Sequence, residues 1–97
     1  MRQTRAAADG WAHMHITLKL FATLTDYLPA AARRANQVEL ELPEGTTVLQ
    51  AFEPFALPAK LVHLVLVNGH YIAPENRATH VLQPGDALAI WPPIAGG

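Results

Sequence analysis

Leu61-Val-His-Leu-Val-Leu-Val-Asn-Gly-His-Tyr-Ile72 is the stretch of this sequence that most directly decides its fold. Residues 61–67 form an almost continuous aliphatic run, which is typical of a strand covered on both faces, and we place this strand at the centre of a sheet. Asn68-Gly69 predicts a type I′ turn, because that turn needs positive φ at both central positions. A short return strand over 70–72 completes a β-hairpin.

Three more strands are predicted around the hairpin by alternation of apolar and polar residues, at 15–22, 37–42 and 87–91. In the last of them Leu88 and Ile90 point inward. A Pro-Gly-Asp turn at 84–86 precedes this strand, and a Pro-Pro pair ends it because proline cannot donate a ladder hydrogen bond.

One main helix is predicted to begin after Thr47, which with Gln50 matches a capping box. Its buried stripe consists of Val48, Ala51, Phe52 and Phe55. Pro54 disfavours helical angles at the residue before it, so this helix should be short. A second helical segment, 25–34, is interrupted by Pro29. The element order predicts an α+β fold, a mixed sheet of about five strands with one helix on one face.

Composition limits the function classes. The chain has 97 residues, 51% of them hydrophobic and 15% charged, which fits one compact domain too small for a large internal cavity. Its net charge of −1, without a basic patch, argues against nucleic acid as a partner. No run approaches the roughly 20 apolar residues that span a bilayer, and there is no secretory signal, so we expect a cytoplasmic protein and no membrane.

Chemistry-bearing residues are sparse. There is no cysteine, the five histidines match no usual zinc spacing, and Glu39, Glu41 and Glu44 resemble a solvated strand edge more than an acid–base pair. We therefore expect no metal, no bound cofactor and no catalytic constellation.

The chain is predicted to have three parts. Residues 1–13 show no periodicity and are predicted to be a disordered N-terminal extension, with Met14 a possible natural start. A domain over 14–93 and a tail over 94–97 follow.

Five segments make the sequence recognisable: 15–22, 42–48, 67–69, 82–86 and Ile90-Trp-Pro-Pro-Ile-Ala-Gly-Gly97. Together they resemble the MoaD/ThiS family of ubiquitin-like, β-grasp sulfur carriers over about residues 14–97. Within the family, the Pro-Pro pair before the tail makes the sequence most similar to the molybdopterin synthase small subunit. Two features depart from the family, the short helix imposed by Pro54 and the extension over 1–13.

The resemblance implies a carrier and not an enzyme. An E1-like adenylyltransferase (MoeB/ThiF-like) would use ATP to adenylate the carboxylate of Gly97, and a persulfide enzyme would displace AMP to leave a C-terminal thiocarboxylate. A molybdopterin synthase large subunit (MoaE-like) would then take the sulfur for the molybdenum cofactor. The tail is formed by Gly97, Gly96, Ala95, Ile94, Pro93 and Pro92. Glycines lacking Cβ pass a narrow channel, while prolines favour an extended base.

Phe21, Trp91 and Tyr71 are predicted to lie on the sheet face opposite the core. There they form a partner-docking patch, or they cover one another or pack under the loop at 23–36. By resemblance, Trp91 and Tyr71 stand where the family contacts its partners. Three other functions stay open. The sulfur could go to thiamine thiazole through thiazole synthase or to another metabolite, Gly97 could form isopeptide bonds as in a protein modifier, or the domain could be an interaction module whose glycines are dispensable.

Overall fold

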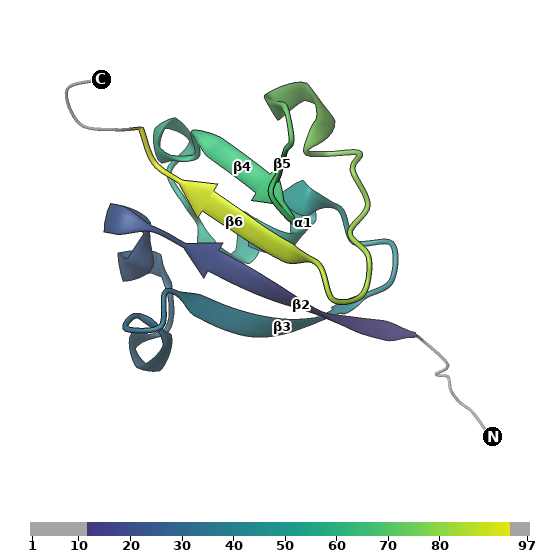
Figure 1. Cartoon of the computed structure of the whole chain (residues 1–97), viewed down its shortest axis with the longest axis horizontal. Coiled ribbons are helices and arrows are strands. Elements are labelled where there is room, and N and C mark those ends of the chain that lie inside the picture. Colours follow the sequence, from purple (N-terminus) through teal and green to yellow (C-terminus); the bar gives the residue numbers. More distant parts are fainter. Residues whose placement is uncertain (1–11, 94–97) are drawn as a thin grey trace.

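The computed structural model describes residues 12–93 of the chain, so the tail predicted at 94–97 and all but two residues of the predicted N-terminal extension lie outside the described residues. One five-stranded sheet runs through the molecule in the order β3-β2-β6-β4-β5 (Figure 1). Its strands are β2 (His13–Leu20), β3 (Gln37–Pro43), β4 (Leu64–Val67), β5 (His70–Tyr71) and β6 (Ala87–Trp91). The pair β2/β6 is parallel and the other pairs are antiparallel. The predicted α+β, β-grasp architecture is confirmed.

The prediction that 61–67 forms a doubly covered central strand is wrong. The strand begins only at Leu64, after the 3₁₀ helix η4 (Ala59–Leu61), and it lies second from one edge. Val65 and Val67 are buried, whereas Leu64 and Leu66 are half-buried on the other face. Because both faces of this strand are aliphatic, its alternation was invisible in the sequence. The central strand is β6, which pairs with β2 on one side and with β4 on the other.

The first strand extends from His13 to Leu20, beginning one residue inside the predicted extension and ending two residues before the predicted end at Ala22. Ala22 has a φ of 54° and opens the 3₁₀ helix η1 (Ala22–Tyr27). A second turn, η2 (Ala30–Ala32), follows Pro29, as the predicted interruption requires. This irregular segment buries Leu24 and Leu28, and it therefore closes the core beside the end of β2.

The main helix, α1 (Val48–Phe52), begins with the predicted capping box. Thr47 Oγ1 accepts from the Gln50 amide and Gln50 Oε1 accepts from the Thr47 amide. The helix passes into the 3₁₀ turn η3 (Glu53–Phe55), so it is short as expected. Glu53 nevertheless keeps right-handed helical angles before Pro54, contrary to the prediction.

The core lies between this helix and one face of the sheet. Side chains from the middle strands are almost fully buried there, namely Ile16, Leu18, Leu20, Val65, Leu88 and Ile90. The corresponding residues of the edge strand β3, Val38, Leu40 and Leu42, are only half-buried, since the five-residue helix does not extend over them fully. Within the described part of the chain, no helix is long and apolar enough to cross a membrane.

Two loops at one end of the sheet hold each other through side chains. Asn68 has a φ of 51° and Gly69 a φ of 84°, which confirms the predicted hairpin turn. Asn68 Nδ2 donates to Asp86 Oδ1 at 2.8 Å, and Asn68 Oδ1 accepts from the Ala87 amide at 2.9 Å. Asp86 Oδ2 accepts from the Gln83 amide at 2.8 Å. These bonds fix the start of β6 against the end of β4, and with it the register of the central strand.

Candidate functional site

The base of the predicted tail is the end of strand β6. The amide of Phe21 donates to the Ile90 carbonyl at 3.2 Å on one side, and the amide of His63 donates to the Trp91 carbonyl at 3.1 Å on the other. Pro92 then ends the strand, because it has no amide to donate. The chain therefore leaves the middle of the sheet from a position that neighbouring segments hold on both sides.

Phe21 and Trp91 stack on each other beside this exit. Their ring centroids are 4.1 Å apart and their planes are parallel within 1°. Both side chains are half-buried, so each ring covers part of the other and leaves the remainder to solvent. Of the arrangements predicted for these aromatics, mutual cover is present for Phe21 and Trp91.

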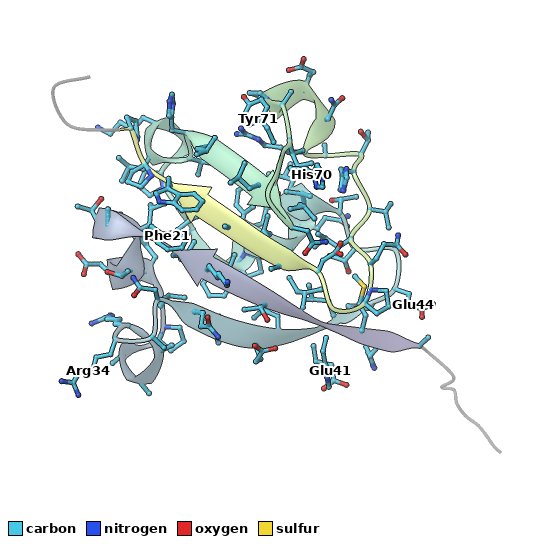
Figure 2. The ribbon with its side chains drawn as sticks, in the orientation of Figure 1. Phe21, Arg34, Glu41, Glu44, His70 and Tyr71 are labelled. Atoms are coloured by element: carbon cyan, nitrogen blue, oxygen red, sulfur yellow. The ribbon has the colours of Figure 1, made fainter. Side chains whose placement is uncertain are left out.

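Tyr71 lies apart from this pair, on strand β5 at the edge of the sheet (Figure 2). Tyr71 pairs with Leu66, which in turn pairs with Ala89. Since paired residues point to the same side of a sheet, Tyr71 lies on the same face as Trp91, two residues along β6 from it. Its side chain is 56% exposed. The structure thus brings Phe21 and Trp91 together but leaves Tyr71 two strands away from β6.

Leucines of β4 connect these aromatics, and they were missed in the sequence. Leu64 pairs with Trp91 and Leu66 pairs with Tyr71, and both leucines are half-buried on the face opposite the core. The register of the Asn68-Gly69 hairpin places both leucines on the same face as Tyr71. The prediction that this strand is buried on both faces concealed that difference between its faces. We define the apolar strip as Phe21, Trp91, Leu64, Ala89, Leu66 and Tyr71.

The same sheet face is polar at its opposite end. Thr17 donates to Glu39 at 2.8 Å, and two histidines approach Glu41, with His13 Nδ1 at 3.8 Å and His15 Nε2 at 3.9 Å. These carboxylates belong to the exposed edge strand β3. The face is therefore apolar near the end of β6 and carries polar and charged side chains, including Glu39 and Glu41, at the far end.

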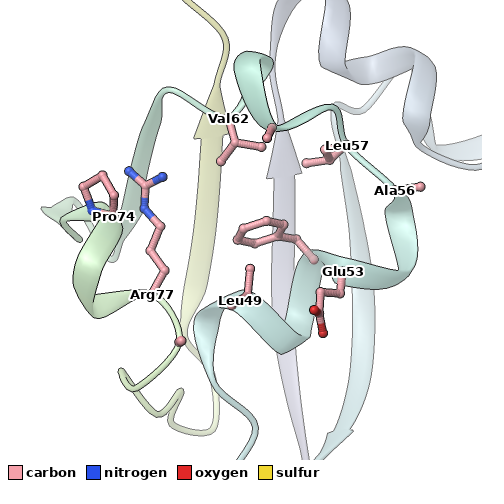
Figure 3. A pocket seen from close by; sticks show the side chains of 10 residues that line it. Leu49, Glu53, Ala56, Leu57, Val62, Pro74 and Arg77 are labelled. Atoms are coloured by element: carbon pink, nitrogen blue, oxygen red, sulfur yellow. The ribbon is translucent and has the colours of Figure 1, made fainter.

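Other features of the described residues lie away from this surface. Residues 12–93 contain no group of three or more histidine, aspartate or glutamate side chains that could hold a metal ion. A pocket of ≈ 350 Å³ opens on the helical side of the molecule, between α1, η4 and the 3₁₀ turn η5 (Pro74–Asn76) (Figure 3). The pocket shares no lining residue with the apolar strip.

The predicted tail is described only at its base. Pro92 is half-buried and Pro93 is exposed, whereas Ile94, Ala95, Gly96 and Gly97 lie outside the described residues. The roles predicted for these residues, and the docking role of the aromatic side chains, therefore stay predictions. What the structure supplies is the fixed exit point and the adjoining apolar strip.

A protein-family model matches most of this chain. The model of the ThiS family matches residues 18–97. No curated protein matches the sequence. Among solved structures, the HVO 2177 protein of Haloferax volcanii is similar with a TM-score of 0.66 and 22% identity, covering 88% of each chain.

Two further solved structures have the same fold. Small archaeal modifier protein 1 of Haloferax volcanii gives a TM-score of 0.60 and 24% identity, covering 84% of this chain and 99% of its own. A putative molybdopterin converting factor, subunit 1, from Pyrococcus furiosus gives a TM-score of 0.61 and 22% identity, with coverage of 84% and 99%. At such identities the likeness establishes the β-grasp fold alone.

Proposed function

The chain belongs to the ThiS family, and from this premise we propose that it carries sulfur as a thiocarboxylate on the C-terminal carboxyl group of Gly97. The observation that carries the proposal is the combination of a Gly-Gly ending with a strand end fixed on both sides by the amides of Phe21 and His63. A fixed base and a side-chain-free tip allow the carboxylate to be presented inside another protein's active site.

A carboxylate must be activated before it can accept sulfur, because its charge and resonance oppose nucleophilic attack. In the proposed sequence, an E1-like adenylyltransferase transfers AMP from ATP to the Gly97 carboxylate and releases pyrophosphate. An enzyme persulfide then attacks the acyl carbon and expels AMP. Reductive cleavage of the resulting acyl disulfide by a thiol leaves the thiocarboxylate on the carrier. The chain itself supplies no cysteine to this chemistry, so the sulfur is held on the terminal carboxyl group.

The destination that we propose for the sulfur is the molybdenum cofactor, with the chain as the small subunit of a molybdopterin synthase and a MoaE-like large subunit as its partner. The Pro92-Pro93 pair before the tail and the likeness to a putative molybdopterin converting factor subunit support this destination. Thiamine thiazole, through thiazole synthase, is the corresponding alternative among carriers.

A protein modifier is the second candidate, and the likeness to a small archaeal modifier protein favours it about equally. In that function a lysine amine attacks the acyl carbon of the adenylated Gly97, and an isopeptide bond forms with release of AMP and a proton. The two functions give different products after incubation with ATP, an activating enzyme, a persulfide donor and a protein extract. Higher-mass conjugates on a denaturing gel would support the modifier, whereas a free chain bearing one sulfur in place of oxygen would support the carrier.

The apolar strip is the proposed docking surface for both the activating enzyme and the large subunit. It adjoins the tail base, so a partner bound there receives the tail at a constant distance from its own active site. Tryptophan and tyrosine side chains, such as Trp91 and Tyr71, are among those that contribute most to such interfaces. The acidic end of the same face, at Glu39 and Glu41, would meet basic residues of the partner.

A further inference from the structure

Arg77 is a buried cation without a neutralising partner among residues 12–93. Its side chain has 7% exposure, and no carboxylate of the described residues lies within salt-bridge distance of it. Nε donates to the Ile72 carbonyl at 3.0 Å and Nη2 donates to the His63 carbonyl at 3.3 Å. These bonds involve one side of the guanidinium group. Nη1 makes no hydrogen bond within the described part of the chain, which leaves a fork of donors suited to a carboxylate.

This guanidinium lines the pocket on the helical side of the molecule. Figure 3 shows it between Pro74 and Val62, with Leu49 and Leu57 among the other lining residues and Glu53 at the opposite wall. The pocket holds ≈ 350 Å³, enough for a few residues of an extended peptide. Its lining combines apolar side chains with the Arg77 cation on one wall and the Glu53 carboxylate on the opposite wall. A short chain end with an aliphatic side chain and a free carboxylate would therefore place its carboxylate at the Arg77 wall, away from Glu53.

The end of β6 lies close to this cation. His63 bonds through its amide to the Trp91 carbonyl at 3.1 Å and through its carbonyl to Arg77 at 3.3 Å. Standard backbone dimensions then place the guanidinium within about 10 Å of the Trp91 carbonyl. The segment 92–97 spans up to about 20 Å when extended, so it is long enough to pass around His63 and reach the pocket.

We propose that the free tail docks back into this pocket, with Ile94 against its apolar wall and the Gly97 carboxylate paired to Arg77. The inference deepens the proposed function, because it concerns the same carboxylate, and it rests on that function only for its regulatory meaning. Adenylation or isopeptide formation replaces the free carboxylate and releases the tail. A docked population of 90% would raise the KM of the activating enzyme for this chain about tenfold.

The test compares amide ¹H–¹⁵N spectra of three forms of the protein, without ATP or enzyme: the full chain, a chain ending at Pro93, and the full chain with a C-terminal carboxamide. We expect the amides of Leu49, Val62 and Ala78 to shift between the full and shortened chains, and the carboxamide to resemble the shortened chain. Identical pocket amides in all three forms would overturn docking. A carboxamide that resembles the full chain would overturn the pairing with Arg77.

A variant pair controls for indirect effects. Ala78→Trp fills the pocket and should move the Gly96 and Gly97 amides to the positions of an unstructured peptide, whereas Thr79→Trp, at an exposed neighbour that does not line the pocket, should leave them unchanged. Unmoved glycine amides in the filled variant would contradict the proposal. A chain that docks its tail but accepts no sulfur would refute the proposed function alone, so the two failures are distinguishable.

Discussion

Asp86 has 8% exposure, and its two carboxylate oxygens accept from the Asn68 side chain and the Gln83 amide. One side chain thus joins the loop before β6 to the turn after β4. The Pro-Gly-Asp and Asn-Gly signals were recognised separately in the sequence, but their mutual contact was not. It depends on β4 and β6 being antiparallel neighbours, which local sequence does not specify.

Replacing Asp86 with alanine should lower the free energy of unfolding by about 1–3 kcal/mol, because the amide donors of Asn68 and Gln83 lose their acceptor in a partly buried site. Thermal denaturation followed by circular dichroism measures the loss. Asp26→Ala is the matched control, since Asp26 is exposed and its carboxylate makes no hydrogen bond among the described residues. Equal melting temperatures for the two variants would contradict the role given to Asp86.

Phe21→Ala should affect both stability and partner binding. Loss of the stack removes about 0.5–1.5 kcal/mol of stability in addition to the loss of apolar burial, and it exposes Trp91 at the tail base.

Tyr71→Ala removes a side chain that is 56% exposed, so it should weaken binding to the activating enzyme while leaving the melting temperature nearly unchanged. Calorimetric titration and thermal denaturation separate the two effects. Unaltered affinity in both variants would exclude the apolar strip as a docking surface.

At the scale of elements, strands bounded by strong signals were predictable. The last strand was predicted at 87–91 and the structure has Ala87–Trp91, because a Pro-Gly-Asp turn precedes it and a proline follows it. The strand β4 was misplaced because its two faces are both aliphatic, which conceals the period of two. Glu53 was misjudged because a proline restricts the preceding residue without forbidding helical angles there.

The capping box predicts a specific loss for the main helix. Thr47→Ala removes the acceptor of the Gln50 amide and should cost about 1 kcal/mol, because this cap closes the first turn of a helix of only five residues. For a domain of this size that corresponds to a melting temperature lower by about 4–8 °C. Thr79→Ala is the control, because its hydroxyl donates to the Asn76 carbonyl in an exposed turn. An unchanged Thr47→Ala melting curve would contradict the capping role.

At the scale of the whole molecule, the candidate site could be predicted only in part. Phe21 and Trp91 lie 70 positions apart, and they meet because β2 and β6 run parallel at the centre of the sheet. Alternation predicted the faces of these residues but could not predict which strands are neighbours. Leu64 and Leu66 entered the site only through the observed register. The reactive end of the chain was inferred from its chemistry and the family, and it lies outside the described residues.

The central claim is that Gly97 carries sulfur. The most direct measurement is the intact mass of the chain after incubation with ATP, an E1-like activating enzyme and a persulfide donor, with a chain lacking Gly97 as control. The account predicts that one oxygen is replaced by sulfur, a gain of about 16 Da from the atomic masses, in the full chain and not in the shortened one. An unchanged mass with an enzyme mixture that is active on another carrier, or an equal gain in both chains, would contradict it.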